Sequence, residues 1–120
     1  MDMGFDYLVG IDGGGSGTRV RLARPDGALI GFGSAGPSAL VGGAETAWRA
    51  MKSALAAAFL AAGVLPPPSR RLVVCLGVAG ATHAPWVEAL RQSVPEFHRF
   101  FVESDAYTAL LGAHGGLPGA

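Results

Sequence analysis

The sequence lacks an excess of charge of either sign. Nine lysines and arginines balance nine aspartates and glutamates over 120 residues, so the formal net charge is zero. Proteins that follow a nucleic-acid backbone carry basic patches or tracts, because contacts to phosphate dominate their affinity. The sequence contains no such tract, which argues against a nucleic-acid partner.

Long hydrophobic runs are also missing. The longest nearly continuous apolar segment, 54–65, is mostly alanine and is shorter than the ~20 residues that a membrane-spanning helix needs. Asp2 and Asp6 stand near the N-terminus, where a secretory signal would place positive charge before an apolar stretch. We therefore expect a soluble, cytoplasmic protein with no membrane partner.

Residues that build disulfides and metal clusters are scarce. The single cysteine, Cys75, lies in the apolar run 72–76 and has no second cysteine to pair with. His83, His98 and His114 are widely separated and follow no metal-ligand spacing. We expect Cys75 to be a core thiol and the three histidines to be surface or capping residues.

Glycine, by contrast, is abundant. There are 19 glycines, about twice the average usage of ~7%, and they concentrate in GIDGGGSGTR, 10–19, directly after an apolar run. The segment fits neither a P-loop, since Ser16 stands where that motif has lysine, nor the G-x-G-x-x-G fingerprint. It is either a tight turn that requires glycine or a loop that exposes backbone N–H groups to a phosphate. The pattern leaves both open, with Asp12 either bonding to the turn or holding Mg²⁺.

Periodicity predicts the elements around this loop. Residues 18–22 alternate polar and apolar side chains, as a half-buried strand does, and the turn Pro25-Asp26-Gly27 precedes a further extended segment at 28–32. Together with the apolar run before the glycines, these segments predict a meander of three strands.

The second half alternates helices and strands. Trp48, Met51, Leu55 and Phe59 follow each other at helical spacing within 45–62. The run 72–80 is apolar without alternation, which is typical of a strand covered on both faces and placed centrally. A helix between Pro85 and Pro95, a strand at 99–103 and a helix at 106–114 complete the order βββαβαβα.

Asp105 stands where the last strand gives way to the last helix. Open α/β sheets place ligand-facing residues at such positions, but a capping role for the helix explains an aspartate there equally simply. The pattern alone slightly favours the cap.

Four segments carry a family resemblance: YLVGIDGGGSGTRVRL, the PDG hairpin, CLGVAGA and ESDAYTALLGAH. In this order they resemble the BadF/BadG/BcrA/BcrD ATPase family, especially its N-acetylglucosamine and glucosamine kinases. The resemblance implies an α/β, ribonuclease H-like lobe of the actin, Hsp70 and sugar kinase superfamily. That lobe is βββαβαβα, with a five-stranded mixed sheet and helices on both faces, and the element order derived from periodicity agrees with it.

The resemblance also implies a site for ATP and Mg²⁺. The family's first phosphate motif corresponds here to Asp12, Gly13, Gly14, Gly15, Ser16 and Thr18. Asp12 would hold the metal, and Ser16 replaces the more usual threonine while keeping the hydroxyl. Asp105 corresponds to the family's catalytic base, which would accept the proton of a sugar hydroxyl.

For the sugar, the resemblance points to Ser38, Gly80 and Asp105. Related kinases often have an asparagine after the third strand, where this chain has Ser38, and Gly80 would let the backbone approach the cleft. Packing alone could also require that glycine. The implied reaction is ATP-dependent phosphorylation of N-acetylglucosamine or glucosamine at the 6-hydroxyl. The residues leave the sugar and the oligomeric state open, a homodimer included.

The resemblance covers the family's N-terminal lobe, residues 1–120, and not its second phosphate motif or adenosine-binding lobe. We therefore expect this lobe alone to be inactive. The alternatives are an activator ATPase of a 2-hydroxyacyl-CoA dehydratase or reductase, a non-catalytic nucleotide-binding module, and an inert lobe.

Overall fold

The computed structural model describes residues 3–103 of the chain. Its elements follow the order β1 (Tyr7–Gly13), β2 (Thr18–Ala23), β3 (Leu29–Ala35), η1 (Leu40–Gly42), α1 (Ala44–Ala62), η2 (Ser69–Arg71), β4 (Leu72–Val78), α2 (Ala84–Ser93) and β5 (Arg99–Glu103). The expected order is confirmed as far as β5. Asp105 and the helix expected at 106–114 lie outside the described residues.

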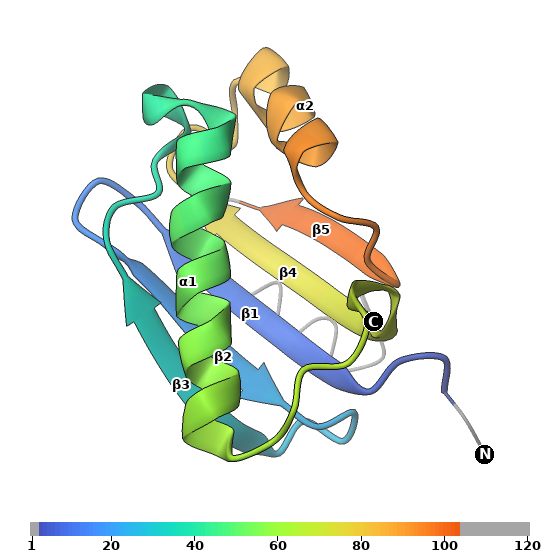
Figure 1. Cartoon of the computed structure of the whole chain (residues 1–120). Coiled ribbons are helices and arrows are strands. Elements are labelled where there is room, and N and C mark those ends of the chain that lie inside the picture. Colours follow the sequence, from blue (N-terminus) through green and yellow to red (C-terminus); the bar gives the residue numbers. More distant parts are fainter. Residues whose placement is uncertain (1–2, 104–120) are drawn as a thin grey trace.

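The five strands form one mixed sheet in the order β3-β2-β1-β4-β5 (Figure 1). β1, β2 and β3 pair antiparallel as the expected meander, whereas β4 runs parallel to both β1 and β5. Helical crossovers return the chain in the same direction, which explains the parallel pairs. The central strand is β1, and β4 lies beside it with all seven of its residues buried.

Strand β3 extends farther than the sequence pattern indicates. Extended structure was expected at 28–32, but β3 ends at Ala35 because its ladder with β2 continues through the pairs Arg19 with Ser34 and Thr18 with Ala35. This extension brings the end of β3 to the glycine-rich loop.

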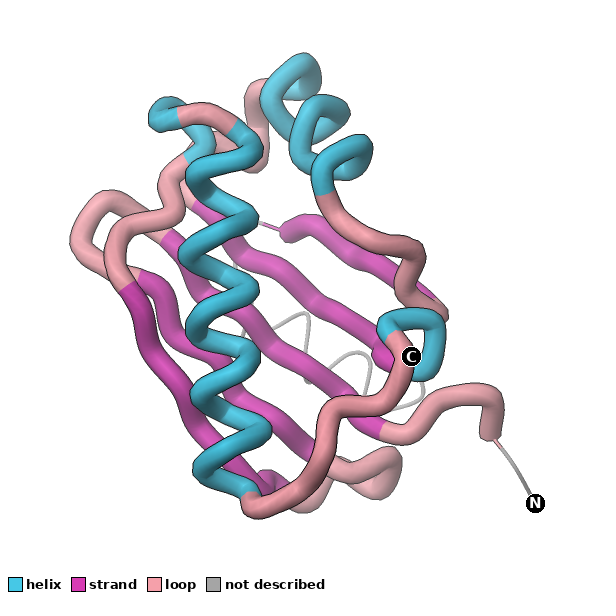
Figure 2. Tube along the Cα trace, in the orientation of Figure 1, coloured by secondary structure: helices cyan, strands magenta, loops and turns pink. Residues whose placement is uncertain are grey.

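Both described helices cover the same face of the sheet (Figure 2). On that face, buried residues of the strands and of both helices form one hydrophobic cluster, which includes Ile11, Leu76, Met51 and Leu90. A second, smaller cluster on the opposite face contains Leu8, Ala23 and Val73. A helix on that opposite face is not among residues 3–103.

Helix α1 contacts β3 backbone to backbone. A Cβ atom at Gly33 would lie 2.0 Å from the carbonyl oxygen of Ala54, and one at Gly31 would lie 2.5 Å from that of Ala58. Ala54 and Ala58 are themselves fully buried. The buried side of α1 is therefore built on alanines as well as on the larger side chains that the sequence pattern emphasises.

Cys75 is buried in β4, which confirms the expected core thiol. Burial, with a smaller effect from the carboxylate of Glu103, raises the pKa of Cys75 to about 11. The thiol therefore stays neutral at physiological pH. Across the described residues, no helix is both long enough and apolar enough to cross a membrane.

The contact between α1 and β3 predicts that Gly33→Ala is strongly destabilising. The added methyl group would meet a helix carbonyl group that cannot turn away, and overpacking of this kind costs about 2–3 kcal/mol. Chemical denaturation measures the loss. Gly36→Ala is the matched control, since a Cβ there meets nothing within 4 Å and should change stability by less than ~0.5 kcal/mol. Equal losses in the two variants would contradict the close contact.

Candidate functional site

The glycine-rich segment is the loop of the β1–β2 hairpin. Gly13 and Thr18 are the last paired residues of the two strands, and within the loop the N–H of Gly14 donates to the carbonyl oxygen of Gly17 at 3.1 Å. The expectation that a glycine loop joins two strands is confirmed.

Three loops meet at this end of the sheet (Figure 1). The N–H of Ser38, after β3, donates to the carbonyl oxygen of Gly14 at 3.0 Å. The N–H of Ala79, after β4, donates to the carbonyl oxygen of Gly13 at 3.0 Å, and its own carbonyl oxygen accepts a bond of 3.1 Å from the N–H of Leu40. Backbone hydrogen bonds thus fix the hairpin loop against both neighbouring loops.

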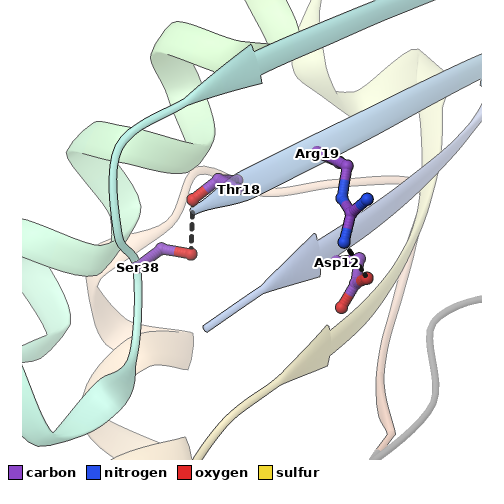
Figure 3. Close-up of polar contacts among 4 residues, drawn as sticks. All are labelled: Asp12, Thr18, Arg19 and Ser38. Carbon is purple, nitrogen blue, oxygen red and sulfur yellow. Dashed lines mark hydrogen bonds and ion pairs between the residues drawn. The ribbon is translucent and has the colours of Figure 1, made fainter. Parts of the chain in front are cut away.

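Two buried hydroxyl groups reinforce this arrangement. The Oγ1 atom of Thr18 donates to the carbonyl oxygen of Gly36 at 2.7 Å and lies 2.6 Å from the Oγ atom of Ser38 (Figure 3). Thr18 and Ser38 are 1% and 2% exposed. Because a hydroxyl group has one hydrogen, Ser38 supplies the hydrogen of the second bond when Thr18 donates to Gly36. Both hydroxyl groups therefore face the protein interior, and a ligand contact by either one stays a prediction.

Gly13 leaves room for Ser38. A Cβ atom at Gly13 would lie 2.1 Å from the Oγ atom of Ser38, a distance that no packed structure contains. Gly13 is buried, and its backbone φ is not positive. Close packing, rather than backbone conformation, requires glycine here.

Gly14 and Gly15 are different, because nothing in the fold requires them to be glycine. Neither has a positive φ, and a Cβ atom at either position would meet no heavy atom of residues 3–103 within 4 Å. Nor does turn geometry explain the choice, since glycine is favoured in turns for its access to positive φ. Open space where a side chain would otherwise stand is what close approach of a ligand to the backbone needs.

The same loop offers unpaired donors. Within residues 3–103, the backbone N–H groups of Gly15, Ser16 and Gly17 have no hydrogen-bond partner. Gly15 and Ser16 are exposed, and Gly17 is half-buried. Successive unpaired N–H groups in a glycine-rich turn can bind an anion such as phosphate.

Asp12 lies beside this loop on the other face of β1 from Ile11 and Gly13. Its carboxylate is 68% exposed and forms an ion pair with Arg19, with 4.0 Å between Oδ2 and Nη2 (Figure 3). An exposed carboxylate suits Mg²⁺, which is typically bound through one or two carboxylates together with water and phosphate oxygens. No group of three or more metal-binding side chains occurs in the part of the chain that the structure describes.

Gly80, expected near the substrate, has a clear packing role. Its φ is +99°, and a Cβ atom there would lie 2.9 Å from the indole ring of Trp86. Conformation and packing therefore both require glycine, and a substrate contact through Gly80 stays a prediction. Asp105, the expected base, lies outside the described residues.

Arg19 is a charged residue at this site that the sequence reasoning did not single out. The hairpin pairs it directly with Asp12, next to the pair of Gly13 and Thr18. The sequence contains a signal that could have identified Arg19. A hairpin with a four-residue loop at 14–17 pairs Asp12 with Arg19, and the period-two pattern places Arg19 on the opposite face from Thr18 and Val20.

A separate hollow of about 420 Å³ lies between α1 and α2, lined by Glu45, Trp48, Arg49, Lys52, Gln92 and Ser93. It contains none of the residues that the sequence assigned to a site.

Comparisons with known proteins point to sugar kinases. The chain is 35% identical over 115 residues to glucosamine kinase GspK of Vibrio cholerae serotype O1, a match that covers 96% of this chain and 39% of that protein. A crystal structure of a Chromobacterium violaceum protein designated an N-acetylglucosamine kinase superimposes with a TM-score of 0.82 and 41% identity, covering 94% of this chain and 40% of that one. No protein-family model matches the chain.

The structural similarity confirms the expected fold class, and both similarities extend over part of each relative. The five-stranded mixed α/β sheet is shared with the Chromobacterium structure, and the chain is similar in sequence to amino-sugar kinases. The chain spans about two fifths of the length of each relative.

The contact between Gly13 and Ser38 predicts energetic coupling. Gly13→Ala alone should lower the free energy of unfolding by about 2–3 kcal/mol, because the new methyl group overlaps the Ser38 hydroxyl. With Ser38→Ala in the background the overlap disappears, and the cost of Gly13→Ala should fall below about 1 kcal/mol. Equilibrium denaturation of the two single variants and the double variant measures this. Strictly additive losses would show that the two side chains do not share the space.

Proposed function

We propose that this chain is the phosphate-binding part of an ATP-dependent kinase that phosphorylates an amino sugar, N-acetylglucosamine or glucosamine, at its 6-hydroxyl. The observation that carries the proposal is the loop 14–17: packing within residues 3–103 does not require glycine at positions 14 and 15, and the N–H groups of residues 15–17 are unpaired there. The similarity to a glucosamine kinase and to a protein designated an N-acetylglucosamine kinase supports the choice of reaction.

The phosphates of ATP fit this loop on chemical grounds. The N–H groups of Gly15, Ser16 and Gly17 can donate to phosphate oxygens, and the Ser16 hydroxyl is exposed beside them. Gly13, Thr18 and Ser38 hold the loop in place from behind. In this proposal the buried hydroxyl groups act by positioning the donors, so that little reorganisation is needed when the nucleotide binds.

Asp12 is the residue that would hold Mg²⁺. Its carboxylate is exposed at the end of β1, next to the loop that would bind the phosphates. When bound, Mg²⁺ neutralises the charge that develops on the phosphates during transfer.

Asp105 would act as the base. In this proposal its carboxylate accepts the proton of the attacking sugar hydroxyl, while Ser38 and Gly80 lie in the loops that border the sugar. The structure supports the placing of these two loops, through the bonds that join them to the hairpin. Membership of the BadF/BadG/BcrA/BcrD family, a cytoplasmic location and a homodimer belong to the same proposal.

ATP turnover in the presence of different sugars tests the reaction. In the full-length protein, N-acetylglucosamine or glucosamine should stimulate ADP release more than glucose does. Asp105→Asn should lower turnover by about 10²-fold or more with nucleotide affinity nearly unchanged, because general-base catalysis contributes at least that much. Absence of stimulation by any sugar would contradict the kinase and favour the activator ATPase or the nucleotide-binding module. Unchanged turnover of the variant would remove Asp105 from the mechanism.

The loop itself is tested by Gly15→Ala. Because a Cβ atom at Gly15 meets nothing within 4 Å among residues 3–103, the variant should keep its stability, yet its methyl group would occupy the space proposed for phosphate. We expect ATP affinity measured by calorimetry to fall about tenfold. Gly42→Ala, at another open position in the short helix η1, is the control and should bind ATP normally. Unaltered ATP binding by Gly15→Ala would place the phosphates elsewhere.

A further inference from the structure

Arg19 forms an ion pair with Asp12, the proposed metal ligand. Its side chain is 81% exposed, and its Nη2 atom lies 4.0 Å from the Oδ2 atom of Asp12 (Figure 3). Within residues 3–103, this ion pair is the interaction that the guanidinium group makes. Arg19 is thus attached to the site by one weak contact only.

The backbone of Arg19, in contrast, is fixed. Thr18 and Val20, its neighbours in β2, are each 1% exposed, and the Thr18 hydroxyl is bonded to Gly36 and Ser38. The ladder holds Arg19 directly opposite Asp12. The strand therefore presents a long, exposed cationic side chain from a fixed backbone position two residues after the loop.

A divalent cation and Arg19 compete for the same carboxylate. An exposed ion pair contributes little, because water screens both charges. Asp12 bound to a divalent cation would attract the guanidinium group less, and the cation would repel it. Arg19 would then be free beside the phosphates that share the cation, and its planar group can donate two parallel hydrogen bonds to phosphate oxygens.

We infer that Arg19 changes partner when the nucleotide binds: it pairs with Asp12 in the free protein and with the phosphates of the metal-bound nucleotide. This inference rests on the proposed function, because it takes Asp12 as the metal ligand and the glycine loop as the phosphate site. The inference makes Arg19 a phosphate-binding residue. It also gives the ion pair a role, because Arg19 occupies the carboxylate of Asp12 until the metal binds.

Two binding measurements on the full-length protein test this inference, and neither needs turnover. The first titrates Mn²⁺ alone, followed by the paramagnetic resonance signal of the free ion. Arg19→Gln should bind Mn²⁺ more tightly than the wild type by about two- to fivefold, since its competitor is gone. The second titrates a non-hydrolysable ATP analogue with Mg²⁺ by calorimetry. Here Arg19→Gln should bind about tenfold more weakly, since a bidentate contact is lost.

Two further variants separate the effect of the planar, two-donor guanidinium group from the effect of its positive charge. Arg19→Lys keeps the positive charge, so its Mn²⁺ affinity should match the wild type, whereas its affinity for the analogue should remain reduced because lysine lacks the planar fork. Arg24→Gln removes an exposed positive charge just after the other end of β2 and should leave both affinities within about twofold.

The opposite signs of the two effects make the test decisive. Changes in Arg19→Gln that match those in Arg24→Gln, or a loss of affinity for both probes, would overturn the inference while leaving the phosphate site intact. A wild-type protein that binds neither Mn²⁺ nor the analogue would overturn the inference together with the proposed function.

Discussion

The absence of a side chain at Gly13 is the constraint on which the site depends. Only a glycine at the end of β1 leaves space for the Ser38 hydroxyl, which lies where a Cβ atom would otherwise project. With Ser38 in that space, the loop after β3 bonds to Thr18 and to the backbone of the hairpin. The loop after β4 joins through the carbonyl oxygen of Gly13 itself. Because Gly13 has no side chain, three segments of the chain can converge at one end of the sheet.

The glycines of this chain serve two distinct physical purposes. At Gly31 and Gly33 they let helix α1 lie directly on β3, with carbonyl groups of the helix where side chains would be. At Gly14 and Gly15 packing within residues 3–103 makes no such demand, and the N–H groups of residues 15–17 have no partner there. An open position alone does not indicate a ligand, because Gly36 and Gly42 are equally open. At Gly14 and Gly15 the open space coincides with three consecutive unpaired N–H groups, and this combination favours a ligand. The contrast within one chain gives this argument its strength.

The two sides of the hairpin end differ in burial and in charge. The inward side of the hairpin end is locked by buried hydroxyl groups, whereas the outward side carries Asp12 and Arg19, whose ion pair is exposed and weak. A backbone held by hydrogen bonds and exposed charged side chains suit a site that binds a highly charged nucleotide without rebuilding its backbone. The similarity to amino-sugar kinases, limited to about two fifths of their length, is consistent with a lobe that contributes this part of the machinery.

The amino-acid sequence by itself determined the order of the elements as far as β5, the hairpin around the glycines, the buried strand β4 and the core position of Cys75. These features depend on local patterns, because periods of two and 3.6 residues and the turn chemistry of proline and glycine act over a few neighbours. Only the tertiary structure decided which glycines are required by packing, that the Thr18 and Ser38 hydroxyl groups face inward, and that Gly80 packs against Trp86. The pairing of Asp12 with Arg19 also emerged only from strand register. Such facts rest on distances between segments that lie apart in the sequence, 20 residues in the case of Thr18 and Ser38, and no local pattern encodes those distances.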